Sequence, residues 1–347
     1  MRKLLCLLCC VAVIVSMCSC AKAGNNSAEV MNSSSGEILS EVASQEILSS
    51  SVTEEREPAG ETSREDKPQS QSASSDESKV EKPVESNTEQ ENEIGGMEPF
   101  IYTVNDPDNL RGLSTEKNGF SFGVAEGGKP HEQSVINQNT FDGYNNVEAL
   151  ALDNKSESKV MYLTFDNGYE FENLTADILD TLKQKNVKAA FFITLSYAKK
   201  NKALVQRMID EGHIVGNHSA SHPSFPKLTR SQMAEEIAKL DNYLRENFSY
   251  SSPYFRFPSG EYSENALELV TSIGFKSVFW SVAYADWDTS SQKGEEYAFS
   301  TVTSRFHPGA VILLHAVSRD NAKALGRMID FAISEGYTFN TLNDYFK

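Results

Sequence analysis

The sequence predicts an α/β domain built on a parallel sheet that is open or closed into a compact or incomplete barrel. From Lys159 onward, short β-rich runs and amphipathic helical patterns alternate about seven times in about 190 residues. Several polar groups that could carry chemistry come directly after these β-rich runs. In parallel α/β folds, functional groups collect at the carboxyl ends of the strands. The two observations together predict an active site along one rim of the sheet.

Seven strands are expected from runs that are rich in β-branched and aromatic residues. They are Val160–Phe165, Ala189–Thr194, Ile214–Gly216, Tyr254–Phe257, Ser277–Val282, Ala310–Leu314 and Thr338–Asn340. Six helices are expected from apolar residues at helical spacing between these runs. They are Thr175–Lys185, Ala203–Glu211, Arg230–Asn247, Glu264–Ser272, Glu295–Arg305 and Asn321–Ser334.

Residues 1–20 are expected to be an export signal, because Arg2 and Lys3 precede an apolar run over residues 4–17. All five cysteines lie in this leader, so the mature chain has no internal disulfide framework. Cys20 follows a small residue and is similar to the lipidated cysteine of a bacterial lipobox, while cleavage after Ala23 with free secretion is the alternative. We expect an exported lipoprotein that is anchored through Cys20 at the outer face of the cytoplasmic membrane and reaches the cell wall.

Residues 21–98 are expected to be a disordered linker rich in Ser and Glu. They carry 18 acidic and 6 basic residues, a net of −12 within the −17 of the whole chain. The acidity therefore describes a self-repelling tether more than a ligand site, and without a basic patch nucleic acid is not expected as a partner. Residues 99–155 show no clear periodicity and are expected to be an irregular extension that packs on the folded domain of residues 156–347.

Two histidines, His218 and His222, are four residues apart after the third predicted strand. Two imidazoles at this spacing can lie on one face of a helical turn and bind one divalent ion. No glutamate follows His218, so the pair does not form the HExxH motif. A pair of structural or surface histidines is the alternative interpretation of this spacing.

The first predicted strand ends in the segment "YLTFDNGYE", which delivers Asp166, Asn167 and Gly168 after an apolar run. A carboxylate in this position next to a metal site can accept a proton from water, which fits Asp166 as a general base. Asn167 offers a neutral carbonyl oxygen where a carboxylate would bind a metal better. A polar strand-to-loop turn explains Asn167 and Gly168 equally well, but it does not explain Asp166.

The later strands contribute further groups. His315 ends a run of apolar residues and suits a general acid that protonates a leaving amine, although a packed histidine is the alternative. Arg256 needs a partner if it is buried, and Asp286 is the expected one. The Pro-Ser-Gly bend after Arg256 could direct the Ser259 N–H at a developing oxyanion, or it could be a simple turn.

In this order, these clusters resemble the polysaccharide deacetylase family with the NodB-type domain, carbohydrate esterase family four. The resemblance covers residues 159–347 and extends into the lead-in from about Gly119. The motifs "TFDNGYE", "GNHSASHPS", "RFPSG", "FWSVAYADWD" and "HPGAVILLHAVSRDNA" are most similar to the subgroup of peptidoglycan N-acetylmuramic acid deacetylases, which make the muramic δ-lactam. The family implies a distorted (β/α) barrel, here of about seven units, and metal-assisted hydrolysis of an N-acetyl group.

The resemblance also implies a role for each matching position. The implied catalytic groups are Asp166 as the base, His315 as the acid, and Arg256 with Asp286 as the supporting pair. The implied metal ligands are His218 and His222, with Asn167 standing where most of the family has Asp and where the muramic subgroup shares the Asn. The implied substrate-binding positions are Ser259 with Gly260 for the oxyanion, and Trp287 with Leu313 around the acetyl group.

The sequence therefore predicts an enzyme that removes acetyl groups from N-acetylmuramic acid in the glycan strand of peptidoglycan, with a divalent metal ion, expected to be zinc, as cofactor. Arg256 could alternatively bind the lactyl carboxylate of muramic acid. The alternatives are the same chemistry on N-acetylglucosamine or on O-acetyl groups of a polysaccharide, and a glycan-binding lipoprotein without activity.

Overall fold

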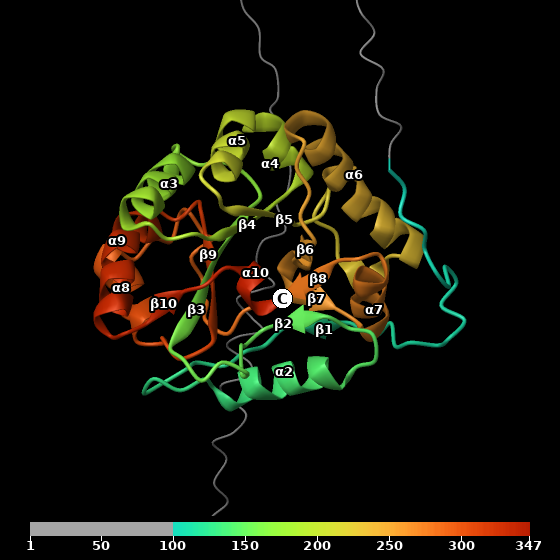
Figure 1. Ribbon diagram of the computed structural model, residues 1–347, viewed down its shortest axis with the longest axis horizontal. Coiled ribbons are helices and arrows are strands. Elements are labelled where there is room, and N and C mark those ends of the chain that lie inside the picture. The colour runs from blue at the N-terminus through green and yellow to red at the C-terminus, as the bar shows by residue number, and fades with distance from the viewer. Residues whose placement is uncertain (1–99) are drawn as a thin grey trace, which may run out of the picture. The chain divides into compact units, whose positions relative to one another are not determined.

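The computed structural model describes residues 100–347 (Figure 1). The predicted signal peptide, its lipidation site Cys20 and the predicted linker over residues 21–98 lie outside the described residues. Within the described part, no helix combines the length and the apolar character that a bilayer crossing requires.

A parallel sheet of eight strands forms the centre of the domain. The strands run in the order β10-β3-β4-β5-β6-β8-β2, and β9 pairs with β3 along the stretch from Met161 to Asp166. A bridge between Val282 and Ile312 brings the end of the β8 segment back to β9, so the sheet curls into a distorted barrel. This confirms the predicted fold class. The strands of this sheet are β2 (Ala149–Leu150), β3 (Val160–Asn167), β4 (Ala190–Ile193), β5 (Ile214–Asn217), β6 (Tyr254–Phe255), β8 (Lys276–Val278), β9 (Ala310–His315) and β10 (Thr338–Phe339).

Helices surround the outside of the curled sheet (Figure 1). All six predicted helices are present, with bounds that differ by up to two residues, and two short ones are added. The helices that follow the strands are α3 (Leu174–Lys185), α4 (Leu195–Lys200), α5 (Lys202–Asp210), α6 (Arg230–Phe248), α7 (Glu264–Ser272), α8 (Glu295–Thr303), α9 (Arg319–Ser334) and α10 (Leu342–Tyr345). Two 3-10 turns, Phe225–Lys227 and Pro258–Gly260, follow β5 and β6.

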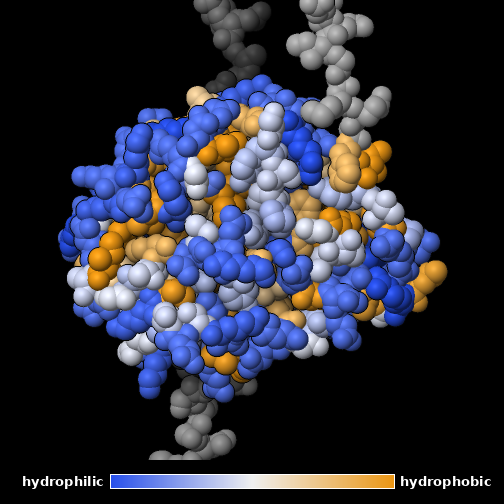
Figure 2. Space-filling model, in the orientation of Figure 1, coloured by the Kyte–Doolittle hydropathy of each residue, from blue (hydrophilic) through white to orange (hydrophobic). Residues whose placement is uncertain are grey.

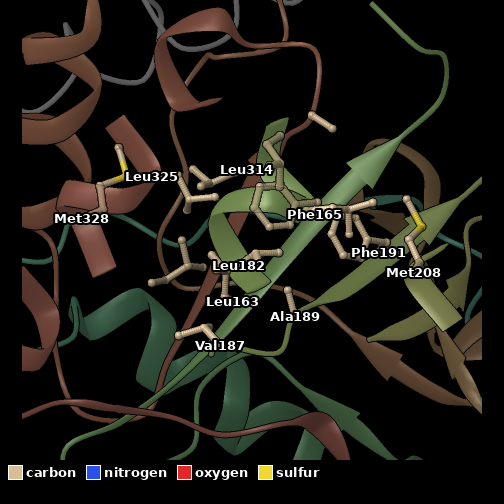
Figure 3. Packing of buried hydrophobic residues seen from close by; sticks show 14 of the residues in the cluster. Leu163, Phe165, Leu182, Val187, Ala189, Phe191, Met208, Leu314, Leu325 and Met328 are labelled. Atoms are coloured by element: carbon tan, nitrogen blue, oxygen red, sulfur yellow. The ribbon is translucent and has the colours of Figure 1, made fainter. Parts of the chain in front are cut away.

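The buried apolar residues form two clusters, and these lie on opposite faces of the strands β3 and β9. Alternate residues of β3, such as Leu163 and Phe165, pack against α3 and α9 in the outer cluster, which Figure 3 shows from close by. Tyr162 and its neighbours Val160 and Leu313 belong to the inner cluster. A strand buried on both faces needs a continuous apolar run, which explains why the sequence of β3 lacks polar alternation. The face shown in Figure 2 is mostly hydrophilic, with apolar patches between the polar side chains.

The extension over residues 100–155 is more regular than the sequence predicts. It contains α2 (Glu132–Gly143) and β2, and the two-residue strand β1 (Asn118–Gly119) pairs antiparallel with β7 (Glu261–Tyr262). The prediction of an irregular segment is therefore wrong for these elements. The physical reason is that α2 buries polar side chains: the Gln138 amide bonds the backbone at Ala149, Ala151 and Leu152, so the helix has no apolar stripe to detect.

Candidate active site

The residues that the sequence singles out meet at the carboxyl ends of the strands. Asp166 and His315 occupy paired positions on the neighbouring strands β3 and β9. Arg256 directly follows β6 and His218 directly follows β5, while Asp286 lies in the segment after β8. The predicted rim is thus formed by groups from five strands or the segments that follow them.

Asp166 is held by a cation on one side and an imidazole on the other. Its Oδ1 accepts a hydrogen bond from Arg256 Nη1 at 2.8 Å, and its Oδ2 lies 3.6 Å from His218 Nε2. Burial by itself would raise the pKa of Asp166, but Arg256, His218 and His315 outweigh burial and hold the pKa below its ordinary value. The carboxylate is therefore ionised at neutral pH, as a general base must be.

Arg256 is buried in the barrel and donates four hydrogen bonds within the protein. In addition to Asp166, its guanidinium donates to Thr164 Oγ1 at 2.9 Å and to the carbonyl oxygens of Val278 and Phe279 at 2.9 and 3.2 Å. It also lies over the ring of Phe192, 4.2 Å from the centroid. The side chain is 0% exposed, so the idea that it binds a lactyl carboxylate of the substrate is wrong.

The pairing of Arg256 with Asp286 is also wrong, because Asp286 belongs to His315. Asp286 Oδ1 accepts the hydrogen bond of His315 Nδ1 at 2.7 Å, and Oδ2 accepts the backbone N–H of the same residue at 2.8 Å. Burial would lower the pKa of His315, but Asp286 and then Asp166 outweigh it and raise the pKa. With Nδ1 bonded to Asp286 and the side chain 24% exposed, Nε2 remains available to a substrate.

His218 and His222 lie in a loop after β5, and the helical turn expected for them is absent at this point of the chain. Their rings are 4.9 Å apart between centroids at 75°. The loop is shaped by two residues in the left-handed region, Ser219 with φ 68° and His222 with φ 59°. Asn217 Oδ1 accepts from the Ser219 N–H, and Ser219 Oγ accepts from the His222 N–H, both at 2.9 Å, so side chains hold this backbone in place.

Both imidazoles are in the form that binds metal. His218 Nδ1 is bonded to the carbonyl oxygen of Arg256 at 2.9 Å, which places the proton on Nδ1 and leaves the Nε2 lone pair free. Burial lowers the pKa of His218 to about 4 and also lowers the pKa of His222. A neutral ring that a backbone carbonyl orients, as in His218, is typical of a metal-ligating histidine.

Asn167 completes the test of whether a metal ion fits. Residues 100–347 contain no cluster of three His, Cys, Asp or Glu side chains with metal-binding geometry, so a third ligand has to be of another type. The Asn167 amide nitrogen donates to Thr175 Oγ1 at 3.3 Å, while its carbonyl oxygen is buried and has no partner in the described chain. An orphaned buried acceptor is costly unless something binds it. Two neutral imidazoles and an unpartnered amide oxygen are donors whose chemistry suits a divalent ion.

The substrate-binding predictions concern the rim around these groups. Ser259 has φ 55° and is exposed, and no hydrogen bond among residues 100–347 uses its N–H as donor. Gly260 has φ 66°. Leu313 is buried on β9 two residues before His315 and faces the same side, whereas the Trp287 side chain is half-exposed. Their roles around an oxyanion and an acetyl group stay predictions.

The structure adds Thr164, Asn321 and Tyr284, which sequence reasoning missed. Thr164 binds Arg256, and its position two residues before Asp166 on the same face of β3 was the available signal. Asn321 donates to Asp286 and accepts from Tyr284, and no spacing in the sequence links these three positions.

An ionised carboxylate and an imidazole with a raised pKa, held across one rim of a parallel barrel, form the acid–base arrangement of a hydrolase. The chain belongs to the polysaccharide deacetylase family, whose model matches residues 153–278. Peptidoglycan-N-acetylmuramic acid deacetylase PdaA of Bacillus subtilis is 43% identical over 198 residues, which cover 57% of this chain and 74% of that relative. Peptidoglycan-N-acetylglucosamine deacetylase of Bacillus cereus is 36% identical over 198 residues, covering 56% of this chain and 70% of that relative. The solved structure of Bacillus subtilis PdaA, a family 4 carbohydrate esterase, is similar with a TM-score of 0.62 at 36% identity, covering 67% of this chain and 97% of that structure.

Proposed function

We propose that this protein hydrolyses the N-acetyl group of N-acetylmuramic acid in peptidoglycan. The observation that carries the proposal is the pairing of Asp166 and His315 on adjacent strands, one with a lowered pKa and the other with a raised pKa. Two groups whose surroundings push their protonation in opposite directions are suited to act as base and acid in one reaction. The similarity to PdaA, which is named for this activity, supports the choice of sugar.

The chemistry assigns one proton transfer to each group. Asp166 Oδ2 accepts a proton from water as the water oxygen forms a bond to the acetyl carbonyl carbon. The Ser259 N–H donates to the oxyanion of the resulting tetrahedral intermediate. The carbon–nitrogen bond then breaks while His315 Nε2 gives its proton to the leaving nitrogen. The products are a free amine on the sugar and acetic acid, which ionises to acetate; Asp166 then releases its proton to solvent and His315 takes one up from solvent.

The family generally depends on a divalent metal ion, and His218, His222 and Asn167 would hold it here. When bound, such an ion would act as a Lewis acid that lowers the pKa of water and polarises the acetyl carbonyl. We propose zinc, because two imidazoles are ligands that this ion favours. Asp166 would accept the proton of the water. Its Oδ2 lies 3.6 Å from His218 Nε2 and is therefore next to one of these ligands.

A second product is expected if the sugar is muramic acid. The freed amine can form an amide bond with the lactyl carboxyl group of the same residue, with loss of one water, and this closes the δ-lactam. Neither N-acetylglucosamine nor an O-acetylated sugar carries this lactyl group. The mass of the product therefore separates the proposed substrate from its alternatives.

The test uses purified full chain and defined glycan strands, with and without stem peptides, in the presence of added zinc. Mass spectrometry of the separated sugars is expected to show loss of the acetyl group from muramic acid, followed by loss of water. Loss of an acetyl group from glucosamine or from an oxygen instead would contradict the proposed sugar. The proposal that the protein is a deacetylase would still stand. Strands that remain unchanged at several metal concentrations would contradict the catalytic proposal and favour the glycan-binding alternative.

Two variants separate catalysis from binding. Asp166→Ala and His315→Ala are expected to abolish turnover and to retain nearly unchanged affinity for the glycan, measured by calorimetry. A pure binding protein would show the same affinities, and its wild type would have no turnover.

For location, we propose a lipid anchor on Cys20, and Cys20→Ala is expected to release the protein from the membrane fraction.

A further inference from the structure

The carboxylate of Asp286 is bound by three donors, and only two of them come from His315. Its Oδ2 also accepts a hydrogen bond from Asn321 Nδ2 at 2.5 Å. Asp286 and Asn321 are each 1% exposed, so water does not replace any of these bonds. A buried carboxylate that lost one of these three donors would be held less firmly against the imidazole.

Asn321 is in turn oriented by a tyrosine. Its Oδ1 accepts the hydrogen bond of the Tyr284 hydroxyl at 2.6 Å, and its backbone N–H binds the Ser318 side chain that caps α9. An asparagine is suited to this position because it donates to Asp286 and accepts from Tyr284 at the same time. A leucine of similar size would do neither, and an aspartate would place a second acceptor against Asp286.

We propose that Asn321 and Tyr284 are positioning residues for the acid, and that they fix the Asp286 carboxylate in the orientation that aligns His315. The inference rests on the proposed function for the role of His315, but the contacts do not depend on it. Tyr284 and Asp286 come from the segment after β8 and Asn321 from α9, so the network joins two elements behind one imidazole.

The proposal makes a prediction about protonation as well as about alignment. The charged or titratable groups around His315 are Asp286, Asp166 from β3, Arg256 from the segment after β6, and His222 from the loop after β5. When Asp286 loses the donor at Asn321, more of its negative charge is available to His315. The imidazolium is then stabilised, and His315 should titrate at higher pH.

The test measures the His315 ring directly by NMR in the zinc-loaded full chain, and the signal is assigned from its loss in His315→Gln. Asn321→Leu is expected to raise the titration midpoint of His315 by roughly half a pH unit or more. Tyr284→Phe should raise it less, because the bond between Asn321 and Asp286 remains. With substrate, Asn321→Leu should lower kcat by about tenfold to a hundredfold, with a smaller change in KM.

Two control variants remove similar bonds elsewhere. Tyr254→Phe removes a hydroxyl that donates to an asparagine, Asn343, at 2.6 Å. Asn137→Leu removes a buried asparagine that donates to the Ser121 carbonyl and accepts from Gln133. Both should lower stability without moving the titration of His315.

An unchanged His315 midpoint in Asn321→Leu would overturn the proposal, whatever the loss of stability. If Asn321→Leu does not fold, Tyr284→Phe decides, and a midpoint equal to that of Tyr254→Phe would overturn it. The NMR measurement needs no substrate. Its result therefore tests the network even if the proposed deacetylation fails. A shifted midpoint together with an inactive wild-type chain would support the network and contradict the function.

Discussion

Removal of the Arg256 side chain is expected to have the largest single effect on the site. Arg256→Met keeps most of the buried volume and deletes the charge that faces Asp166. The guanidinium donates to a carboxylate, a hydroxyl and two backbone carbonyl groups, all of which would lose a partner. Breaking one side of a buried ion pair costs about 3–5 kcal/mol of unfolding free energy. That is a large part of the roughly 5–15 kcal/mol by which domains are stable.

The same variant should reverse the pH dependence that Asp166 contributes to stability. In the wild type the pKa of Asp166 is lowered in the folded state, so its contribution is present above the unfolded pKa and is lost as pH falls through the folded pKa. Without Arg256, burial dominates and the folded pKa moves above the unfolded value. The folded state then holds one more proton between the two pKa values, and stability falls by about 1.4 kcal/mol per pH unit as pH rises.

The assay is urea unfolding between pH 5 and pH 8, followed by tryptophan fluorescence. Trp280 reports on the site, because its ring centroid lies 5.7 Å from the Arg256 guanidinium. The double variant Arg256→Met with Asp166→Asn should recover a large part of the loss, since it leaves no unpaired charge. A single variant that loses less than about 1 kcal/mol and keeps the wild-type pH dependence would refute the assigned coupling.

Two further predictions concern the turn after Arg256 and the acid. Gly260→Ala would place a Cβ 2.9 Å from the Trp280 ring at a residue with φ 66°. The control is Gly274→Ala, because Gly274 also has a positive φ but a Cβ there meets open space. Gly260→Ala should lower the unfolding free energy by about 1–3 kcal/mol more than the control does, and equal losses in thermal unfolding would contradict the contact. Asp286→Asn removes the charge that raises the pKa of His315, so kcat should fall by about 10²–10⁴ and the alkaline limb of its pH profile should move to lower pH. The stability that this pair contributes is present below the unfolded histidine pKa and is lost as pH rises through the folded pKa, and denaturant titration should find this loss missing in the variant.

Much of the fold could be predicted because the parallel strands are buried on both faces. Runs such as Val160–Phe165 and Ala310–Leu314 carry a continuous apolar signal, and the helices between strands keep an apolar stripe. Because the carboxyl ends of parallel strands lie at one edge of the sheet, the polar residues that follow these strands are predicted to share one rim. The helix α2 gave no such signal, because its buried face is formed by Ser134, Asn137 and Gln138 as well as Phe141.

The partners within the site could not be predicted from charge and spacing alone. Arg256 requires a buried anion, and the sequence offers Asp166 and Asp286 equally well. The choice depends on which way each side chain points. Asp166 faces the barrel interior together with Thr164, whereas Asp286 lies in a segment without strand periodicity, where no alternation fixes its direction. Side-chain direction in an irregular segment is a property of the tertiary fold.

The observed pairing explains why the site can hold base and acid in opposite protonation states. If Arg256 paired with Asp286, their charges would offset one another, and burial would then raise the pKa of Asp166 and lower the pKa of His315. Each group would then be shifted toward its neutral form, which is the wrong form for its assigned step. With the cation beside Asp166 and the anion beside His315, each buried charge instead stabilises the protonation state that catalysis requires. The two ion pairs thus offset the cost of burial separately, and this separation makes the rim chemically competent before any substrate binds.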